Sequence, residues 1–170
     1  MLSGVACGLF AVACHSRRSN AALPSIAPML LTDSDTVWVT RRNGIRVLFV
    51  ASTLTNRLPQ RIYVRRCRQS GLVGIEKRVN ASWQRVYEPV CALGDISVLA
   101  LGPNQSHNDM HRVTIGPFYP RFNVAEMEGE YRAQYGVYTE YETGGRSGRP
   151  ISKLAPEEWR MTNTFRIVER

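Results

Sequence analysis

The chain has 170 residues, a hydrophobic content of 44% and a formal net charge of +8 at pH 7. This length suits one ordinary domain with a leader, and the apolar content excludes a globally disordered protein. Arginine carries nearly all of the positive charge, because Lys77 and Lys153 are the only lysines. Such a charge favours anionic partners, although arginines spread over many segments are also what genome composition alone produces.

Residues 1–14 are typical of a secretory leader. The run from Leu2 to Ala13 is apolar and rich in small residues, and it is too short to span a bilayer. Its end, AVAC, resembles a bacterial lipobox, which predicts that Cys14 becomes lipidated and N-terminal. Two departures are an alanine at position 11, where leucine is more usual, and the lack of a basic residue at the start. A plain cleaved signal and a short buried segment are the alternatives.

Residues 15–31 contain two prolines, several serines and no sustained periodicity. This composition is typical of a flexible tether. We therefore expect a folded domain over residues 32–170, exported to the cell envelope and lipid-anchored on the periplasmic or extracellular side.

The body of the chain is predicted to be all β. Runs of Val, Ile, Phe, Tyr and Thr recur about every ten residues between Gly, Pro and Asn, while helix signals are almost missing. The expected strands are Thr36–Thr40, Ile45–Ser52, Arg61–Cys67, Gly71–Val79, Ser82–Glu88, Ile96–Leu101, Arg112–Gly116, Tyr131–Tyr138 and Thr164–Val168. Apolar residues alternate along many of them, so each strand buries one face. The pattern predicts two packed antiparallel sheets, with a closed barrel as the alternative.

Cys67 and Cys91 bracket a predicted β-hairpin that turns at Asn80-Ala81. The chain has no CxxC motif and no Cys/His spacing of a zinc site, so this pair predicts a disulfide at the domain edge and an oxidising compartment. In the chain-entropy model, closing a loop of this size contributes about 3 kcal/mol.

The phrases GLVGIEKRV, SWQRVYEPVC and GEYRAQYGVY, followed by NTFRIV, resemble uncharacterised bacterial envelope proteins with one immunoglobulin-like domain, many of them lipoproteins. The resemblance implies an immunoglobulin-like sandwich and says little about activity. Gly129-Glu130-Tyr131 also resembles the tyrosine corner of such sandwiches, in which the phenol bonds back to nearby backbone.

The chain offers little for metal or catalytic chemistry. His107 and His111 lie in SHNDMH, which follows Gly-Pro-Asn and is predicted to be a loop. No serine lies in a G-x-S-x-G elbow, and with both body histidines in one loop a Ser-His-Asp assembly is not expected. The glycine-rich run 144–149 lacks the ending of a phosphate loop, and the glutamates near Tyr131 are expected to be solvated. We therefore predict no catalytic residue, no metal site and no cofactor.

The connection over 143–161 is the expected binding surface. It is longer than a tight hairpin and holds Arg146, Arg149, Lys153 and Trp159. Trp159 is either a partner contact or a cap on the core. Tyr63 is surrounded by a second basic strip, formed by Arg61, Arg65, Arg66 and Arg68, but aromatic residues there are too sparse for a nucleic-acid platform.

These features predict a non-enzymatic, envelope-anchored binding or structural module. Its expected partners are the membrane, through the lipid anchor, and an envelope protein or anionic envelope polymer, but no nucleic acid. The alternative is a protease inhibitor of the small bacterial β-sandwich type, with residues 144–150 entering the protease cleft.

Overall fold

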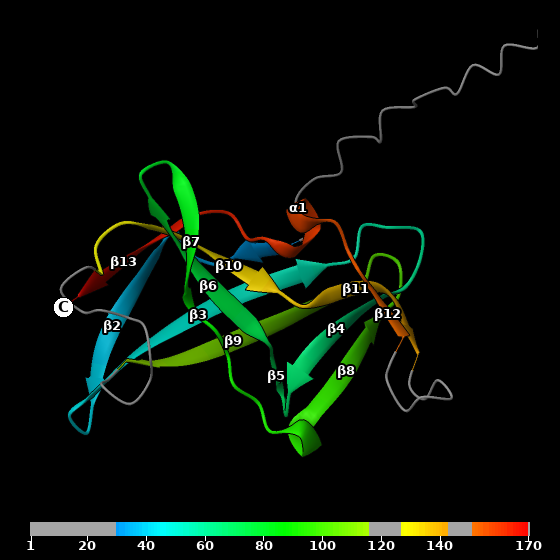
Figure 1. Cartoon of the computed structure of the whole chain (residues 1–170), viewed down its shortest axis with the longest axis horizontal. Helices are drawn as coiled ribbons and strands as arrows, with labels where there is room; N and C mark the ends of the chain where they lie inside the picture. Colours follow the sequence, from blue (N-terminus) through cyan, green and yellow to red (C-terminus); the bar gives the residue numbers. More distant parts are fainter. Residues whose placement is uncertain (1–29, 116–126, 143–150, 170) are drawn as a thin grey trace, which may run out of the picture.

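The computed structural model describes residues 30–115, 127–142 and 151–169, and these ranges form a sandwich of two β-sheets (Figure 1). Cys14, Arg146 and Arg149 lie outside the described residues. The all-β, two-sheet prediction is confirmed, and the barrel alternative is wrong for the part of the chain that is described.

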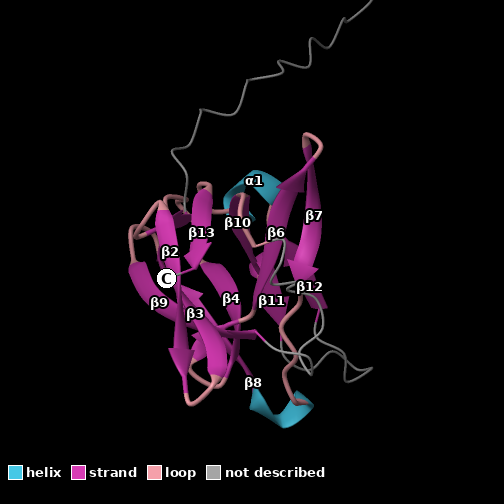
Figure 2. Ribbon diagram, turned by 90° about the vertical axis from the view of Figure 1, so that its left-hand side faces the viewer, coloured by secondary structure: helices cyan, strands magenta, loops and turns pink. Residues whose placement is uncertain are grey.

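The larger sheet has eight strands and the smaller sheet has five. The larger runs in the order β1 (Leu30–Thr32), β3 (Ile45–Thr55), β2 (Thr36–Arg42), β13 (Phe165–Glu169), β10 (Glu130–Tyr135), β6 (Val73–Val79) and β7 (Ser82–Tyr87), with β9 (Ser106–Ile115) also paired to β3. The smaller runs in the order β12 (Ile151–Leu154), β11 (Val137–Glu142), β4 (Ile62–Cys67) and β5 (Ser70–Gly71), with β8 (Ile96–Leu101) also paired to β4. A short 3-10 helix, η1 (Leu93–Asp95), and the four-residue helix α1 (Glu157–Arg160) complete the described elements. Figure 2 shows the β6–β7 hairpin on one side of the molecule and β2 and β9 on the other.

The strand pairs are antiparallel with one exception, because β13 pairs with β2 in parallel. The expectation of wholly antiparallel sheets is therefore wrong for this pair. A parallel neighbour requires a long crossover rather than a hairpin, and here almost the whole domain separates the two strands.

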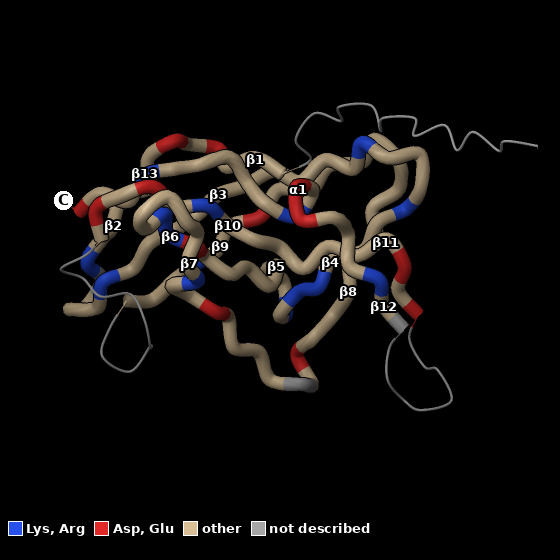
Figure 3. Tube along the Cα trace, turned by 45° about the horizontal axis from the view of Figure 1, so that its top comes forward, with Lys and Arg blue, Asp and Glu red and all other residues tan. Residues whose placement is uncertain are grey.

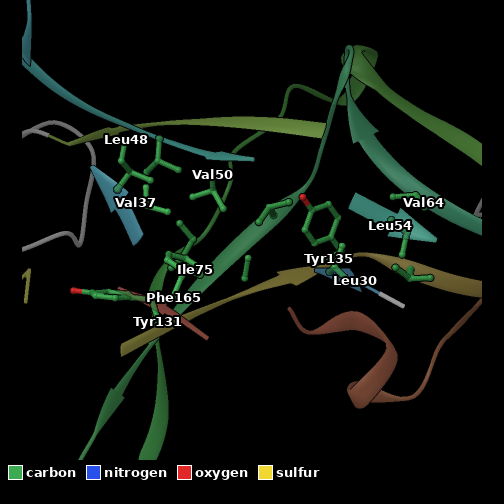
Figure 4. Close-up of a cluster of buried hydrophobic side chains, with 14 of the residues drawn as sticks. Leu30, Val37, Leu48, Val50, Leu54, Val64, Ile75, Tyr131, Tyr135 and Phe165 are labelled. Atoms are coloured by element: carbon green, nitrogen blue, oxygen red, sulfur yellow. The ribbon is translucent and has the colours of Figure 1, made fainter. Parts of the chain in front are cut away.

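The predicted alternation sets the core. Tyr131, Ala133 and Tyr135 of β10 are all buried, while the residues between them are only partly so. Figure 4 shows Tyr131 beside Phe165 at one end of the core and Tyr135 among Leu30, Leu54 and Val64 at the other. The Tyr131 hydroxyl donates to the carbonyl oxygen of Met127 at 2.6 Å, so the predicted tyrosine corner is confirmed.

The predicted turns are also present. Asn43 and Gly44 have φ values of 52° and 75° between β2 and β3. Asn80 and Ala81 have φ values of 47° and 63° in the β6–β7 hairpin. Positive φ at both central residues gives a two-residue turn the twist that flanking strands require, and glycine and asparagine tolerate it most readily.

Three segments differ from the sequence predictions. β1 begins at Leu30, within the segment expected to be a tether. The expected 143–161 connection contains β12 and α1, so its described part is not a simple loop. SHNDMH is the first half of β9 rather than a loop, because β9 pairs with β3 residue by residue from Ser106 to Ile115.

An interruption between β4 and β6 positions the candidate site. The two strands pair with consecutive parts of the β10–β11 segment, since Val64 pairs with Val137 and Val73 pairs with Tyr135. The residues between these two pairs do not pair with β10 or β11. They form an excursion that is closed where the Leu72 N–H donates to the Arg65 carbonyl oxygen at 3.0 Å. Residues 66–71 therefore form a small hairpin, here called the detour, which contains β5.

Candidate functional site

A surface cleft of about 320 Å³ lies between the β6–β7 hairpin, the start of the detour and α1. Its lining includes three arginines, Arg65 of β4, Arg85 of β7 and Arg160 of α1, together with Gln134 of β10. Leu72, Pro89 and Ile96 give it an apolar wall. In Figure 3, basic and acidic residues are mixed along β6, β7 and β10, the strands at one side of this cleft.

Arg85 is held in place by charge and by shape. Its guanidinium donates to Glu88 at 2.8 Å and to Glu76 at 3.2 Å. It lies over the backbone of Gly74, where any Cβ would overlap Nη1. Glycine at position 74 is therefore needed for the guanidinium to lie across β6.

Glu76 is a buried carboxylate that joins two arginines. Besides Arg85, it accepts a hydrogen bond from Nε of Arg132 at 2.8 Å, and its side chain is only 11% exposed. Arg132 also lies 4.6 Å from the centre of the Trp83 ring and pairs with Glu157 at 3.1 Å. A buried carboxylate with two charged donors is well compensated, so Glu76 holds the guanidinium of Arg85, which lines the cleft, in place.

The guanidinium groups of Arg65 and Arg160 make fewer hydrogen bonds within the described residues than that of Arg85. Arg160 donates from Nε to the carbonyl oxygen of Ala155 at 2.9 Å, which leaves its terminal nitrogens for a ligand. Arg65 is partly buried, and within the described ranges its side chain has no hydrogen bond or ion pair. A partly desolvated guanidinium without a carboxylate partner favours an anionic ligand.

The predicted disulfide is present and borders the cleft. Cys67 and Cys91 are joined, with Cα atoms 5.7 Å apart. The bond ties the detour to the segment between β7 and η1, whose Glu88, Pro89 and Cys91 line the cleft. A second, smaller cavity of about 170 Å³ lies on the other side of the same segment, beside Cys67 and His111.

A buried polar network lies in the core behind the detour. The Tyr135 hydroxyl is hydrogen bonded to Ser52 Oγ and to His111 Nε2. Asp109 Oδ2 lies 3.5 Å from the same imidazole nitrogen and accepts a hydrogen bond from the Gly71 N–H at 2.6 Å. The network therefore connects β3, β9 and β10 to the detour.

Burial controls the titration of this network. It lowers the pKa of His111 to about 4, a shift that the nearby charge of Asp109 opposes and that of His107 reinforces. Burial also raises the pKa of Tyr135 above its usual range, in spite of the opposing hydrogen bond from Ser52. The imidazole and the phenol are therefore both neutral at pH 7.

Ser52, His111 and Asp109 all lie in this network, but they do not make the contacts of a Ser-His-Asp triad, because the Tyr135 hydroxyl lies between Ser52 and His111. The Tyr135 hydroxyl contacts both Ser52 and His111, and the serine is only 1% exposed. A nucleophile needs direct contact with its base and access to substrate. The network is thus built to join strands.

The residues predicted for binding are only partly described. Lys153 lies on β12, is exposed, and pairs with Glu140 at 3.3 Å. Trp159 is partly buried and packs against the core, which favours its structural role. The arginines of the cleft were missed as a group, although Arg65 belonged to the basic strip around Tyr63 in the sequence analysis. The described residues contain no group of three His, Cys, Asp or Glu side chains able to hold a metal ion.

Comparisons with known proteins leave the family open. The sequence matches no protein-family model and no curated protein. Among solved structures, it is similar to an alkylpurine DNA glycosylase, AlkC of Pseudomonas fluorescens, bound to DNA with an abasic site analogue. The TM-score is 0.36 at 8% identity, over 84% of this chain and 31% of the glycosylase. Within the described ranges, no helix has the length and apolarity needed to cross a membrane.

Proposed function

We propose that this protein is an exported, lipid-anchored binding module without enzymatic activity, and that its ligand sits in the cleft of Arg65, Arg85 and Arg160. The observation that carries this proposal is the unpartnered guanidinium of Arg65 in a cleft with two further arginines. Binding sites typically combine a concave, partly apolar surface with a few convergent polar groups, and this cleft has both.

The disulfide supports export, because such bonds persist in oxidising compartments. The lipid anchor rests on the lipobox resemblance that ends at Cys14. Together they support the proposal of a module at the cell envelope, where phosphate-rich lipids and anionic polymers are abundant partners for a basic surface.

A binding screen by NMR tests the proposal. Backbone amide spectra of the purified protein would be recorded with pools of anionic, neutral and cationic small molecules. We expect shifts at cleft residues with anions only, and at least a tenfold loss of affinity in Arg65→Gln, because a charge-assisted hydrogen bond contributes about 1.5–3 kcal/mol.

Arg61→Gln is the matched control. Arg61 is an exposed arginine just before β4 and does not line the cleft. Its removal lowers the net charge equally and should leave binding unchanged. Anion-induced shifts located away from the cleft, or equal losses in the two variants, would overturn the proposal.

A further inference from the structure

We infer that the ligand of the arginine cleft carries a phosphate ester, and that Glu88 occupies the place of its charge in the free protein. This inference rests on the proposed function and specifies the chemistry of the same cleft.

The arrangement of donors favours a phosphate over a carboxylate. Arg65, Arg85 and Arg160 line the cleft from three separate elements, β4, β7 and α1. A carboxylate presents only two oxygens in one plane, and Glu76 binds one arginine through each of them, Arg85 through Oε1 and Arg132 through Oε2. A tetrahedral phosphate presents three oxygens in three directions, which suits three separate guanidinium groups.

The shape of the cleft favours an ester over inorganic phosphate. Its volume of about 320 Å³ leaves room for an organic substituent beside the anion. Leu72, Pro89 and Ile96 supply apolar surface for that substituent, and Gln134 supplies an amide for its polar groups. Ligand pockets of this kind gain affinity from the apolar wall and orientation from the few polar groups.

Glu88 is more exposed than Glu76 and has fewer ion pairs, as expected of a group that a ligand displaces. Its side chain is 61% exposed, and within the described ranges its only ion pair is the one with Arg85, at 2.8 Å. Glu76 is buried and shared between two arginines. Glu88 also follows β7 immediately, in a segment outside the regular strands. An exposed ion pair contributes little to stability, so an incoming phosphate displaces Glu88 at little cost.

Two substitutions in the cleft should change the affinity for phosphate in opposite directions. Arg65→Gln removes a donor and should weaken binding at least tenfold, as in the proposed function. Glu88→Gln removes the competing charge and leaves the side chain nearly the same size, so it should tighten binding several-fold. Gly74→Ala should weaken binding without changing any charge, because a Cβ displaces the Arg85 guanidinium.

The test uses the full chain with Cys14→Ser, so that no lipid anchor contributes to vesicle binding. Glycerol 3-phosphate and citrate are titrated by calorimetry, and vesicles of phosphatidylcholine with or without phosphatidic acid, whose headgroup is a phosphate monoester, are tested by co-sedimentation. The cleft variants and Arg61→Gln are compared in each arm. Binding of glycerol 3-phosphate with the predicted order of affinities supports a soluble ester. The same order with phosphatidic acid vesicles alone supports a lipid headgroup.

The remaining outcomes separate the two proposals. If citrate alone binds and depends on Arg65, the phosphate inference is wrong and the anion-binding function stands. If none of the probes binds in a manner that depends on Arg65, both are wrong. Weaker phosphate binding by Glu88→Gln than by the parent would refute the role assigned to Glu88.

Discussion

Mild acid should destabilise this protein through His111, before most carboxylates titrate. The imidazole is 5% exposed and hydrogen bonded to Tyr135, and its pKa in the folded protein is about 4, against 6.5 for an unperturbed histidine. Between these values the unfolded chain binds a proton that the folded protein excludes. The stabilisation is therefore fully present above pH 6.5 and is lost as the pH falls towards 4.

The magnitude follows from the two pKa values. Excluding the proton costs the folded state about 1 kcal/mol at pH 6, about 2 kcal/mol at pH 5 and about 3 kcal/mol at pH 4. For a domain of this size, 2 kcal/mol is roughly a quarter of a typical unfolding free energy. The pH range from 7.5 to 5 isolates the histidine, because ordinary carboxyl groups have pKa values near 4.

Urea unfolding with the disulfide intact, followed by tryptophan fluorescence, measures this loss. The parent should lose about 2 kcal/mol between pH 7.5 and pH 5 through His111. His111→Gln keeps a hydrogen-bonding group near the Tyr135 hydroxyl and cannot titrate. It should be less stable than the parent at pH 7.5 and lose much less stability on acidification.

His107→Gln is the control. His107 lies on the same face of β9 and contributes to the lowered pKa of His111, so its replacement should leave most of the pH dependence in place. Equal slopes for the parent and His111→Gln between pH 7.5 and pH 5 would refute the assignment.

Three further predictions concern the corner, the disulfide and the anchor. Tyr131→Phe removes the buried hydrogen bond to Met127 and should cost about 1–3 kcal/mol in thermal unfolding; an unchanged melting temperature would argue against it. Alkylation without reductant should leave Cys67 and Cys91 unlabelled in intact-mass spectra, and their reduction should lower the free energy of unfolding by about 3 kcal/mol. Cys14→Ser should move the protein from the membrane fraction to the soluble fraction, whereas unchanged fractionation would require another anchor.

The fold was predictable where local pattern and tertiary structure agree. Tyr131, Ala133 and Tyr135 alternate in the sequence and are all buried. The prediction of a loop for SHNDMH was wrong. The segment has no β-branched residue and contains strongly polar ones, which is typical of loops, but its pairing with β3 makes it a strand. Strand propensity depends on the neighbouring strand, and no local rule contains that information.

The cleft was not predictable because its arginines lie far apart in the sequence. Arg65, Arg85 and Arg160 are brought together by the pairing of β10 and β11 with β6 and β4, and by the position of α1 at the end of the β12 segment. Each of them alone is one arginine among many in a basic chain. Only Gly74, a glycine within a predicted strand, was a local signal of close approach by another group.

The buried network and the cleft are connected through the edge of β9 that faces away from β3. Within the described residues β9 pairs only with β3, and the Asp109 carboxylate covers part of its other edge. Oδ1 accepts from the Met110 N–H at 2.9 Å, and Oδ2 from the Gly71 N–H at 2.6 Å. A Cβ at residue 71 would lie 2.9 Å from that carboxylate, so only glycine lets the detour approach so closely.

The carboxylate therefore replaces part of a missing strand and fixes the detour to the core. Cys67, near the start of the detour, in turn holds Cys91 and the wall that carries Glu88. Asp109→Ala would release this support from a position outside the cleft lining. The disulfide and this carboxylate act beside the pairing of β4 with β8 and the Arg68–Asp95 ion pair. Because both hold the wall of the cleft, anion affinity should be more sensitive to these two links than to surface charge away from the cleft.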